Sequence, residues 1–392
     1  MNDTDLATQI SELARFDPRS QRGIEGMQIL ARNLEGEAPI RENLLIRCDS
    51  GTLSLRAEFV AQRMLQIATN TRNPNAAVAW FRKIPAIISR GTAVGGAVKV
   101  LHGVDCGERI SLSEDIVLLP YSALPPSLMR NNFIARYEPG FWNGPPQSFV
   151  LPPRAALYRA GVISVTSDGT QDVIHSPPNT WFEELTTASL LLSLTPKTVP
   201  IEAAHWFNYE DPDTELLCQF GLSWQSSDFS PLGRLTQPGT VSVDSARGMM
   251  DLYRRLSDDH RDRVKLSLQR LIRARCQIKP GDRAIDLAIA LEILYMNADR
   301  DEHSYKIALR AARFLYGPGE QRHEAFRRIR RLYDMRSSMV HRGSASDKWR
   351  VGGTDVTAYD LVESVDGLCA RSISLFLRQG RLPDTWREIE LS

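Results

Sequence analysis

The fold prediction for this chain starts from a run of residues near its C-terminal end. The run reads Leu332-Tyr333-Asp334-Met335-Arg336-Ser337-Ser338-Met339-Val340-His341-Arg342-Gly343. At about 100° per residue, the apolar side chains of this region continue a single stripe along a helix. The stripe comprises Phe326, Ile329, Leu332, Tyr333 and Val340. This pattern predicts an amphipathic helix that packs against other helices and ends near Gly343.

Two polar residues stand out on this helix. Arg336 falls inside the apolar stripe, and His341 falls on its flank. An arginine within a packing face needs a partner or a bound anion. Arginine stays charged and holds phosphate, whereas histidine exchanges a proton near neutrality, so the Arg-x4-His pair suits metal-independent RNA cleavage. The same spacing fits a structural arrangement, in which Arg336 pairs with a carboxylate and His341 interacts with the last turn of its helix.

The composition is that of an ordinary globular protein. The 392 residues are 42% hydrophobic and 24% charged, and this length predicts two domains. The acidic, polar start is no secretory signal, and no apolar run is long enough to span a bilayer. The five cysteines are scattered, which argues against a disulfide framework and a structural zinc site. We therefore expect a cytoplasmic protein without a cofactor, a bound metal or a membrane partner.

The charges are distributed unevenly along the chain. Residues 251–350 contain 23 Lys and Arg against 14 Asp and Glu, a net charge of +9. The remainder contains 25 against 33, a net charge of −8. A basic segment attached to an acidic one favours a polyanionic ligand for the basic part. The alternative is that the basic residues form a solvated helix face, whose charge the acidic remainder of the chain offsets.

The first 240 residues predict a mixed α+β region. Residues 5–84 are mostly helical by their periodicity, with Val60, Met64 and Ile67 on one face. Residues 84–234 are richer in Pro and Gly, and their apolar runs predict short β-strands. Candidate strands are 110–112, 116–119 and 162–165, and the cluster Gly91, Gly95 and Gly96 indicates a flexible turn. Trp206 and Phe207 either stack on a base or belong to the core, and the core is the usual place for such a run.

The remaining residues, 241–392, predict an all-α helical bundle. A linker at 237–240 precedes it, and residues 243–379 are predicted as helices joined by loops, including a polar loop at 344–353. The helix at 284–297 is apolar almost all round, which indicates a central, buried position. The fold class is therefore α+β, with residues 1–240 as one domain and 241–392 as the other.

Three stretches of the C-terminal third resemble the Apea-like branch of the HEPN superfamily. They are Ala290-Leu291-Glu292-Ile293-Leu294, Glu302-His303-Ser304-Tyr305-Lys306-Ile307-Ala308-Leu309-Arg310-Ala311-Ala312, and the run 332–343 quoted above. Their order and spacing resemble the family's pattern over about a third of the chain, residues 245–380. One departure is Arg342, which stands between His341 and Gly343 where His-Gly is the commoner pairing.

The resemblance implies a helical-bundle domain that forms a homodimer, with two Arg-x4-His motifs facing each other across a cleft. Many members are metal-independent endoribonucleases of toxin, abortive-infection and antiphage defence systems. Carried over to this chain, the catalytic residues would be Arg336 and His341. Ser337 occupies the position after the arginine, which is polar in many members. The implied partners are RNA and an antitoxin or a phage-derived trigger.

Further residues are assigned to this predicted site. Arginines expected to hold the RNA backbone are Arg322, Arg327, Arg328, Arg330, Arg331 and Arg342, unless they only form a solvated face. Glu292 and Glu302 would orient Arg336 or pair the helices, and Tyr333 would support the site.

The expected products of the reaction are a 2′,3′-cyclic phosphate and a 5′-OH. Two alternatives share the fold: a non-catalytic RNA-binding or sensor protein, and a structural dimerisation module. We expect residues 1–240 to sense a trigger or to block the site, although no motif supports this role.

Overall fold

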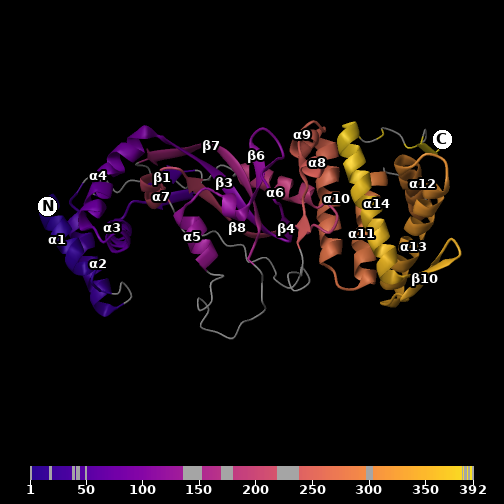
Figure 1. Ribbon diagram of the computed structural model, residues 1–392, viewed down its shortest axis with the longest axis horizontal. Helices are drawn as coiled ribbons and strands as arrows, with labels where there is room; N and C mark the ends of the chain where they lie inside the picture. The colour runs from indigo at the N-terminus through magenta and orange to yellow at the C-terminus, as the bar shows by residue number, and fades with distance from the viewer. Residues whose placement is uncertain are drawn as a thin grey trace.

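The structure is a computed structural model that describes residues 2–16, 20–37, 40, 45–48, 51–135, 152–168, 180–218, 238–296, 303–381, 383, 386 and 389–390. Figure 1 shows N-terminal helices, a β-sheet and a C-terminal helical bundle following one another along the long axis. The α+β fold class predicted from the sequence is confirmed. None of the described helices is both long and apolar enough to cross a membrane.

The N-terminal part is helical, as predicted, apart from one β-hairpin. Its helices are α1 (Asp3–Leu13), α2 (Gln21–Leu34), α3 (Ala57–Thr71) and α4 (Pro74–Arg90). Val60, Met64 and Ile67 are buried on one face of α3, which confirms their predicted phase. The hairpin consists of β1 (Leu45–Cys48) and β2 (Gly51–Ser54), and it joins the edge of the main sheet through β7.

The main sheet is antiparallel and has the strand order β2-β1-β7-β3-β8, with β6 also pairing with β7 and β5 with β6. Its further strands are β3 (Thr92–His102), β5 (Ile110–Ser111), β6 (Ile116–Pro120), β7 (Ala155–Asp168) and β8 (Ile201–Tyr209). A separate parallel pair consists of β4 (Val104–Asp105) and β9 (Gly239–Thr240). The predicted linker at 237–240 therefore contributes a strand, which ties the start of the bundle to the sheet.

The short strands predicted at 110–112 and 116–119 match β5 and β6, and Gly91 ends α4 with a left-handed φ of +73°, as a turn requires. The prediction of short strands and of a glycine turn is wrong for the centre of the sheet. β3 has 11 residues and β7 has 14, and Gly95 and Gly96 lie within β3. A Cβ at Gly95 would lie 2.2 Å from the carbonyl oxygen of Asn208, and one at Gly96 would lie 2.5 Å from that of Arg159. These glycines let the neighbouring strands approach closely, which is a use of glycine that a turn signal in the sequence cannot distinguish.

Helices cover both faces of the sheet. α6 (Thr180–Leu192) packs on β3 and β7. α5 (Leu128–Ile134) packs on the other face, where Phe133 lies against Trp206 of β8 with ring centroids 5.9 Å apart. Phe207, the next residue, lies against Phe182 of α6 at 5.0 Å. Trp206 and Phe207 are therefore core residues on opposite faces of β8 and are not available to stack on a base. Short elements η2 (Tyr121–Ala123) and α7 (Pro212–Cys218) complete this region.

The C-terminal bundle is built around one buried helix. Its elements are α8 (Val243–Ala246), α9 (Met249–Arg254), α10 (Asp258–Cys276), α11 (Pro280–Tyr295), α12 (His303–Leu315), α13 (Glu320–Arg342) and α14 (Ala358–Gln379). α11 packs against α10, α12, α13 and α14, which confirms the predicted central helix. The prediction of helix and loop alone is wrong at 344–353, because β10 (Lys348–Val351) and β11 (Thr354–Thr357) form a hairpin there.

Candidate functional site

The predicted site lies on the C-terminal half of α13. The helix buries Ala325, Ile329, Leu332 and Met335 at helical spacing, which fixes the rotation of α13 about its axis. It ends at Gly343, whose φ of +68° lies in the left-handed region and whose N–H donates to the Met339 carbonyl oxygen at 3.0 Å. Val340 is an exception to the predicted stripe, since its side chain is 57% exposed in the last turn.

Arg336 lies at the interface between α13 and α11, and its side chain is 39% exposed. Its Nη2 lies 4.0 Å from Oε1 of Glu292 on α11. Its Nε is buried and has no hydrogen-bond partner among the described residues. The carboxylate partner that the sequence suggested is therefore present. The contact with Glu292 is long and involves only Nη2. The guanidinium therefore keeps N–H donors that are available to bind an anion.

Tyr333 supports this interface from one turn earlier on α13. Its hydroxyl donates to the Ala288 carbonyl oxygen of α11 at 3.2 Å. Burial raises the pKa of Tyr333 well above its ordinary value, the charge of Glu292 adds to that rise, and Arg336 opposes it. Tyr333 thus stays neutral and holds α13 against α11 beneath Arg336.

His341 and Ser337 are exposed on the same end of the helix. His341 follows Arg336 by five residues, which is about 7.5 Å along the axis and about 140° around it. Neither His341 nor Ser337 forms an ion pair or a hydrogen bond within the part of the chain that the structure describes. Arg342 donates to Ser338 Oγ at 2.6 Å, so its charge lies beside His341 in the last turn. The imidazole is free to meet a substrate from solvent.

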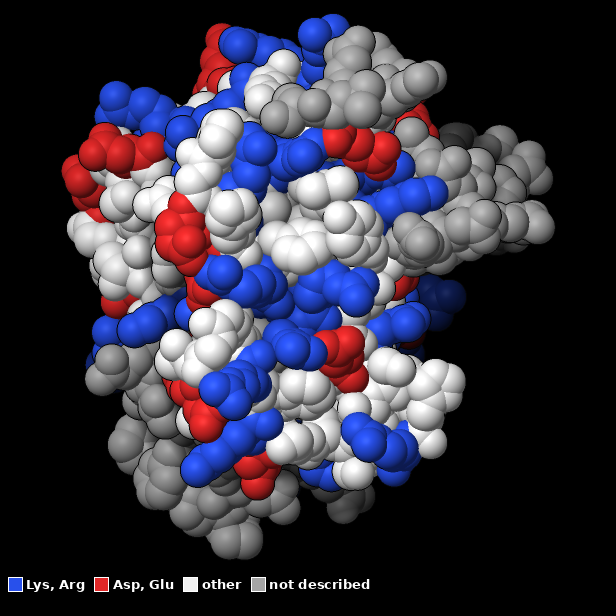
Figure 2. Space-filling model, turned by 90° about the vertical axis from the view of Figure 1, so that its right-hand side faces the viewer, with Lys and Arg blue, Asp and Glu red and all other residues white. Residues whose placement is uncertain are grey.

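The other candidate arginines lie nearer the start of α13 and have protein partners. Arg327 and Arg328 pair with Glu324, and Arg331 pairs with Asp334 at 2.7 Å. Arg330 donates to Ser304 Oγ at 2.7 Å and lies over the Tyr305 ring. Arg322 donates to the Tyr316 carbonyl oxygen at 3.0 Å. Arg327 is about 21 Å from His341 along the helix axis. Figure 2 shows the face of the bundle that lies on the right in Figure 1, where Lys and Arg side chains are widespread and interspersed with acidic ones.

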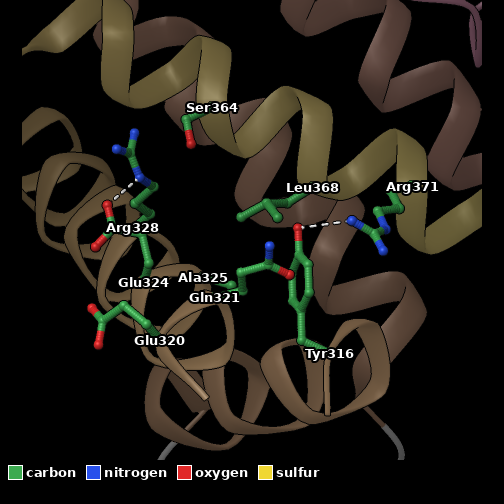
Figure 3. A pocket seen from close by; sticks show the side chains of 9 residues that line it. All are labelled: Tyr316, Glu320, Gln321, Glu324, Ala325, Arg328, Ser364, Leu368 and Arg371. Carbon is green, nitrogen blue, oxygen red and sulfur yellow. Dashed lines mark hydrogen bonds and ion pairs between the residues drawn. The ribbon is translucent and has the colours of Figure 1, made fainter. Parts of the chain in front are cut away.

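A pocket near Arg328 lies away from the predicted site. It has a volume of ≈ 370 Å³ and lies between α13, α14 and the residue after α12, Tyr316. Figure 3 shows that its two arginines are engaged, Arg328 with Glu324 at 2.6 Å and Arg371 with the Tyr316 hydroxyl at 3.1 Å. Neither Arg336 nor His341 lines it, so the structure separates Arg328 from the Arg-x4-His pair. Glu302, also predicted to support the site, lies outside the described residues.

The structure shows a second polar cluster that the sequence did not reveal. Glu202 of β8 accepts from Lys99 of β3 and contacts His205 Nδ1 at 2.5 Å, and Lys99 also donates to Thr186 Oγ1 of α6 at 2.8 Å. Burial alone would raise the pKa of Glu202, but the hydrogen bond with His205 and the charge of Lys99 outweigh it and lower the pKa to about 2. This triad, in which Lys99 is buried and the other two side chains are about a fifth exposed, joins sheet and helix.

A register shift between β3 and β8 explains why this cluster could not be predicted from the sequence. Val100 pairs with Ala204 and Leu101 pairs with Glu202, so one extra residue, Ala203, is accommodated in β8. The bulge turns Glu202 and His205, which are three residues apart, to the same face. Simple alternation would have placed them on opposite faces.

Comparison with known proteins gave no match, whether against family models, curated proteins or solved structures. Among the described residues, no group of three or more His, Cys, Asp and Glu side chains is arranged to hold a metal ion.

Proposed function

We propose that this protein is a metal-independent endoribonuclease of the HEPN type that acts in a defence or toxin system. The observation that supports this most is the position of Arg336. It is half-exposed on a packing face, lies beside Glu292 at 4.0 Å, and keeps an orphaned buried Nε. A helix with a purely structural role would more simply carry an apolar residue there. An exposed histidine follows one and a half turns later.

The proposed reaction uses the nucleophile that RNA itself carries. His341 accepts the proton of the 2′-OH, the 2′-oxygen attacks phosphorus, and the bond to the 5′-oxygen breaks. Arg336 stabilises the added negative charge on the phosphorane-like transition state. A proton then reaches the leaving 5′-oxygen, which gives a 2′,3′-cyclic phosphate and a 5′-OH. Ser337 is adjacent to Arg336 and exposed, where it can donate to a phosphate oxygen.

A homodimer would supply the second imidazole that such a reaction can use as its acid. Exposed apolar side chains support this part of the proposal. Val340, Ile278 and Tyr359 are each more than half exposed, and the Tyr359 hydroxyl donates to the Ile278 carbonyl oxygen at 3.2 Å. Met339, next to Val340, packs on Gly281 at the start of α11. All of them therefore belong to the end of the bundle that carries His341.

The test is controlled expression of the parent chain and of His341→Ala and Arg336→Ala variants in a bacterial host. His323→Ala serves as the matched control, because His323 is also an exposed histidine on α13. We expect growth arrest and new RNA fragments with 5′-OH ends from the parent and the control only. Removal of one transition-state donor should lower the cleavage rate by about 10²–10³-fold.

Three outcomes separate the candidate functions. Cleavage by His341→Ala at the parent rate means that the proposed site is wrong. RNA binding without cleavage in the parent would favour the binding or sensor protein. Ile329, which the sequence placed on the apolar stripe, is fully buried, so the dimer is tested at the exposed Val340 instead. If neither binding nor cleavage occurs, while Val340→Asp dissociates a dimer, the structural module is the better description.

A further inference from the structure

A second cavity lies where the sheet region meets the bundle, and it shares one lining residue, Arg371 of α14, with the pocket near Arg328. Its volume is ≈ 580 Å³, within the usual range for ligand sites of roughly 300–1,000 Å³. One wall is the turn after α6, residues 194–197, and the other is α14 between residues 363 and 378. Arg336 and His341 do not line it.

The turn that forms the first wall is held rigidly. Arg275 of α10 donates to the carbonyl oxygens of Ser193 at 2.5 Å and Thr198 at 2.8 Å, one on each side of the turn. The same guanidinium pairs with Asp366 of α14 through two nitrogens, each at 2.8 Å from a carboxylate oxygen. Both side chains are less than a tenth exposed. Arg275 and Asp366 therefore neutralise each other and position the wall.

Lys197 is presented into the cavity at a conformational cost. Its φ is +61°, and among described residues other than glycine only Arg72 shares this left-handed conformation. A non-glycine residue in that region is strained by about 1–2 kcal/mol. Strained residues persist where the surrounding structure over-determines them, often at functional positions. Gly239 of β9 packs directly on the Lys197 carbonyl group, which explains how the strain is maintained.

The cavity has unneutralised positive charge. Lys197 and Arg378 have no ion pair or hydrogen bond within the described parts of the chain. Arg371 lies seven residues before Arg378 on the same face of α14, and its cation stacks on Tyr316 at 4.5 Å. The acidic lining residues are both engaged, Asp366 with Arg275 and Glu363 with Arg283 at 2.6 Å. Leu194, Leu315 and Leu375 add an apolar part to the lining.

We propose that this cavity binds a small anion that carries a polyphosphate group, with Lys197, Arg371 and Arg378 as its ligands. Three cations around one opening match a chain of phosphates, and the leucines offer a surface to an attached organic group such as a nucleoside. The occupant would touch both the turn of the sheet region and α14, so its binding would hold the two parts together. The proposal does not depend on ribonuclease activity.

The test is calorimetric titration of the full chain with ATP and with inorganic tripolyphosphate, in the presence of a chelator. Two variants remove cations, and each has a matched control. Lys197→Gly is compared with Arg72→Gly, since both relieve a left-handed residue. Arg378→Ala is compared with Arg32→Ala, because Arg32 is exposed on α2, far from the cavity.

The parent is expected to bind at least one probe, more weakly as salt is added. Lys197→Gly and Arg378→Ala should each weaken binding by roughly tenfold or more, and the controls should bind like the parent. Lys197→Gly should not lower the melting temperature, and neither should Arg72→Gly, because each relieves a left-handed φ. A folded Lys197→Gly variant would show that its lost binding is not misfolding. Tighter binding of ATP would assign the apolar wall to the nucleoside, and equal binding would assign the site to polyphosphate alone. If the parent binds neither probe, or if both cavity variants bind like the parent, the proposal is overturned.

Discussion

Arg336 and Glu292 illustrate how little a half-exposed ion pair contributes to folding and how much it can contribute to a site. The pair is 4.0 Å long and Arg336 is 39% exposed, so solvent screens it, and Glu292→Gln should change the free energy of unfolding by at most about 1 kcal/mol. The rate of RNA cleavage should fall nonetheless, because Glu292 no longer positions the guanidinium of Arg336. This fall should be smaller than that caused by Arg336→Ala. Urea unfolding and cleavage assays measure the two effects. Glu324→Gln is the control, and equal loss of cleavage in that variant would contradict a positioning role for Glu292.

Glu202 allows a prediction about pH. Its folded pKa of about 2 lies below the ordinary value of about 4.5, so its charge contributes stability above pH 4.5 that is lost as the pH falls toward 2. Glu202→Gln also leaves Lys99, only 5% exposed, without its anion. We expect a destabilisation of about 3 kcal/mol at neutral pH that shrinks across this window. Urea unfolding at a series of pH values would measure it. Glu210→Gln, at an exposed position on the next segment, should show no such trend, and a constant difference for Glu202→Gln would refute the assignment.

At the scale of elements, the last turn of α13 depends on Gly343. Its φ of +68° is strained for any residue with a Cβ, so Gly343→Ala should cost about 1–2 kcal/mol and fray the turn that carries His341. Gly317→Ala is a close control, because a Cβ there also meets nothing within 4 Å but the φ is not left-handed. Amide hydrogen exchange of α13 would report the fraying. Equal protection in both variants would show that the cap is unimportant.

Elements with a strong period were predictable, and elements set by partners far along the chain were not. The buried faces of α3, α11 and α13 follow from apolar spacing alone. The β10–β11 hairpin was missed because a polar, glycine-containing stretch also fits a loop. Gly95 and Gly96 indicated a turn because only the approach of Asn208 and Arg159, more than sixty residues away, shows why β3 needs them.

The candidate site shows the same division. Arg336 and His341 could be singled out because they share one helix with a known period. The contact of Arg336 with Glu292 was expected only from a resemblance, since it joins two helices. The triad of Lys99, Glu202 and His205 depends on a bulge and on the register of β3 with β8, which no local pattern encodes.

At the scale of the whole molecule, the two predicted domains are joined by a network of ion pairs. Arg254, at the end of α9, pairs with Asp115 before β6 at 2.8 Å and with Glu184 of α6 at 3.1 Å. Arg159 of β7 contacts both carboxylates at 2.9 Å. Burial alone would raise the pKa of Asp115, but the hydrogen bonds from Arg254, Ser113 and Arg159 lower it well below its usual range. The network thus favours the joined state at neutral pH and weakens in acid.

The apolar core is a second connection between the sheet region and the bundle, independent of the ion pairs. One continuous cluster of buried side chains extends from α1, through the sheet and α6, to α14. Because burial of this cluster requires both parts, we expect the parent to unfold in one calorimetric transition rather than two. The core would then be what makes the sheet region and the bundle unfold together, and the ion pairs would strengthen that coupling.

Arg254→Ala tests this division of roles. It removes the only side chain of the network that the bundle contributes, and the groups are about a third exposed, so the loss should be about 1–3 kcal/mol. The main effect should be a broader transition with a ratio of calorimetric to van't Hoff enthalpy above that of the parent. Arg255→Ala is the control, since Arg255 is the adjacent residue, is exposed, and has no ion pair within the described residues. Acidification should reduce the difference between the two variants, because protonated Asp115 no longer holds Arg254 in the parent state. Identical transitions for the two variants at neutral pH would show that the core alone couples sheet and bundle, and that the network is only a surface feature of the junction.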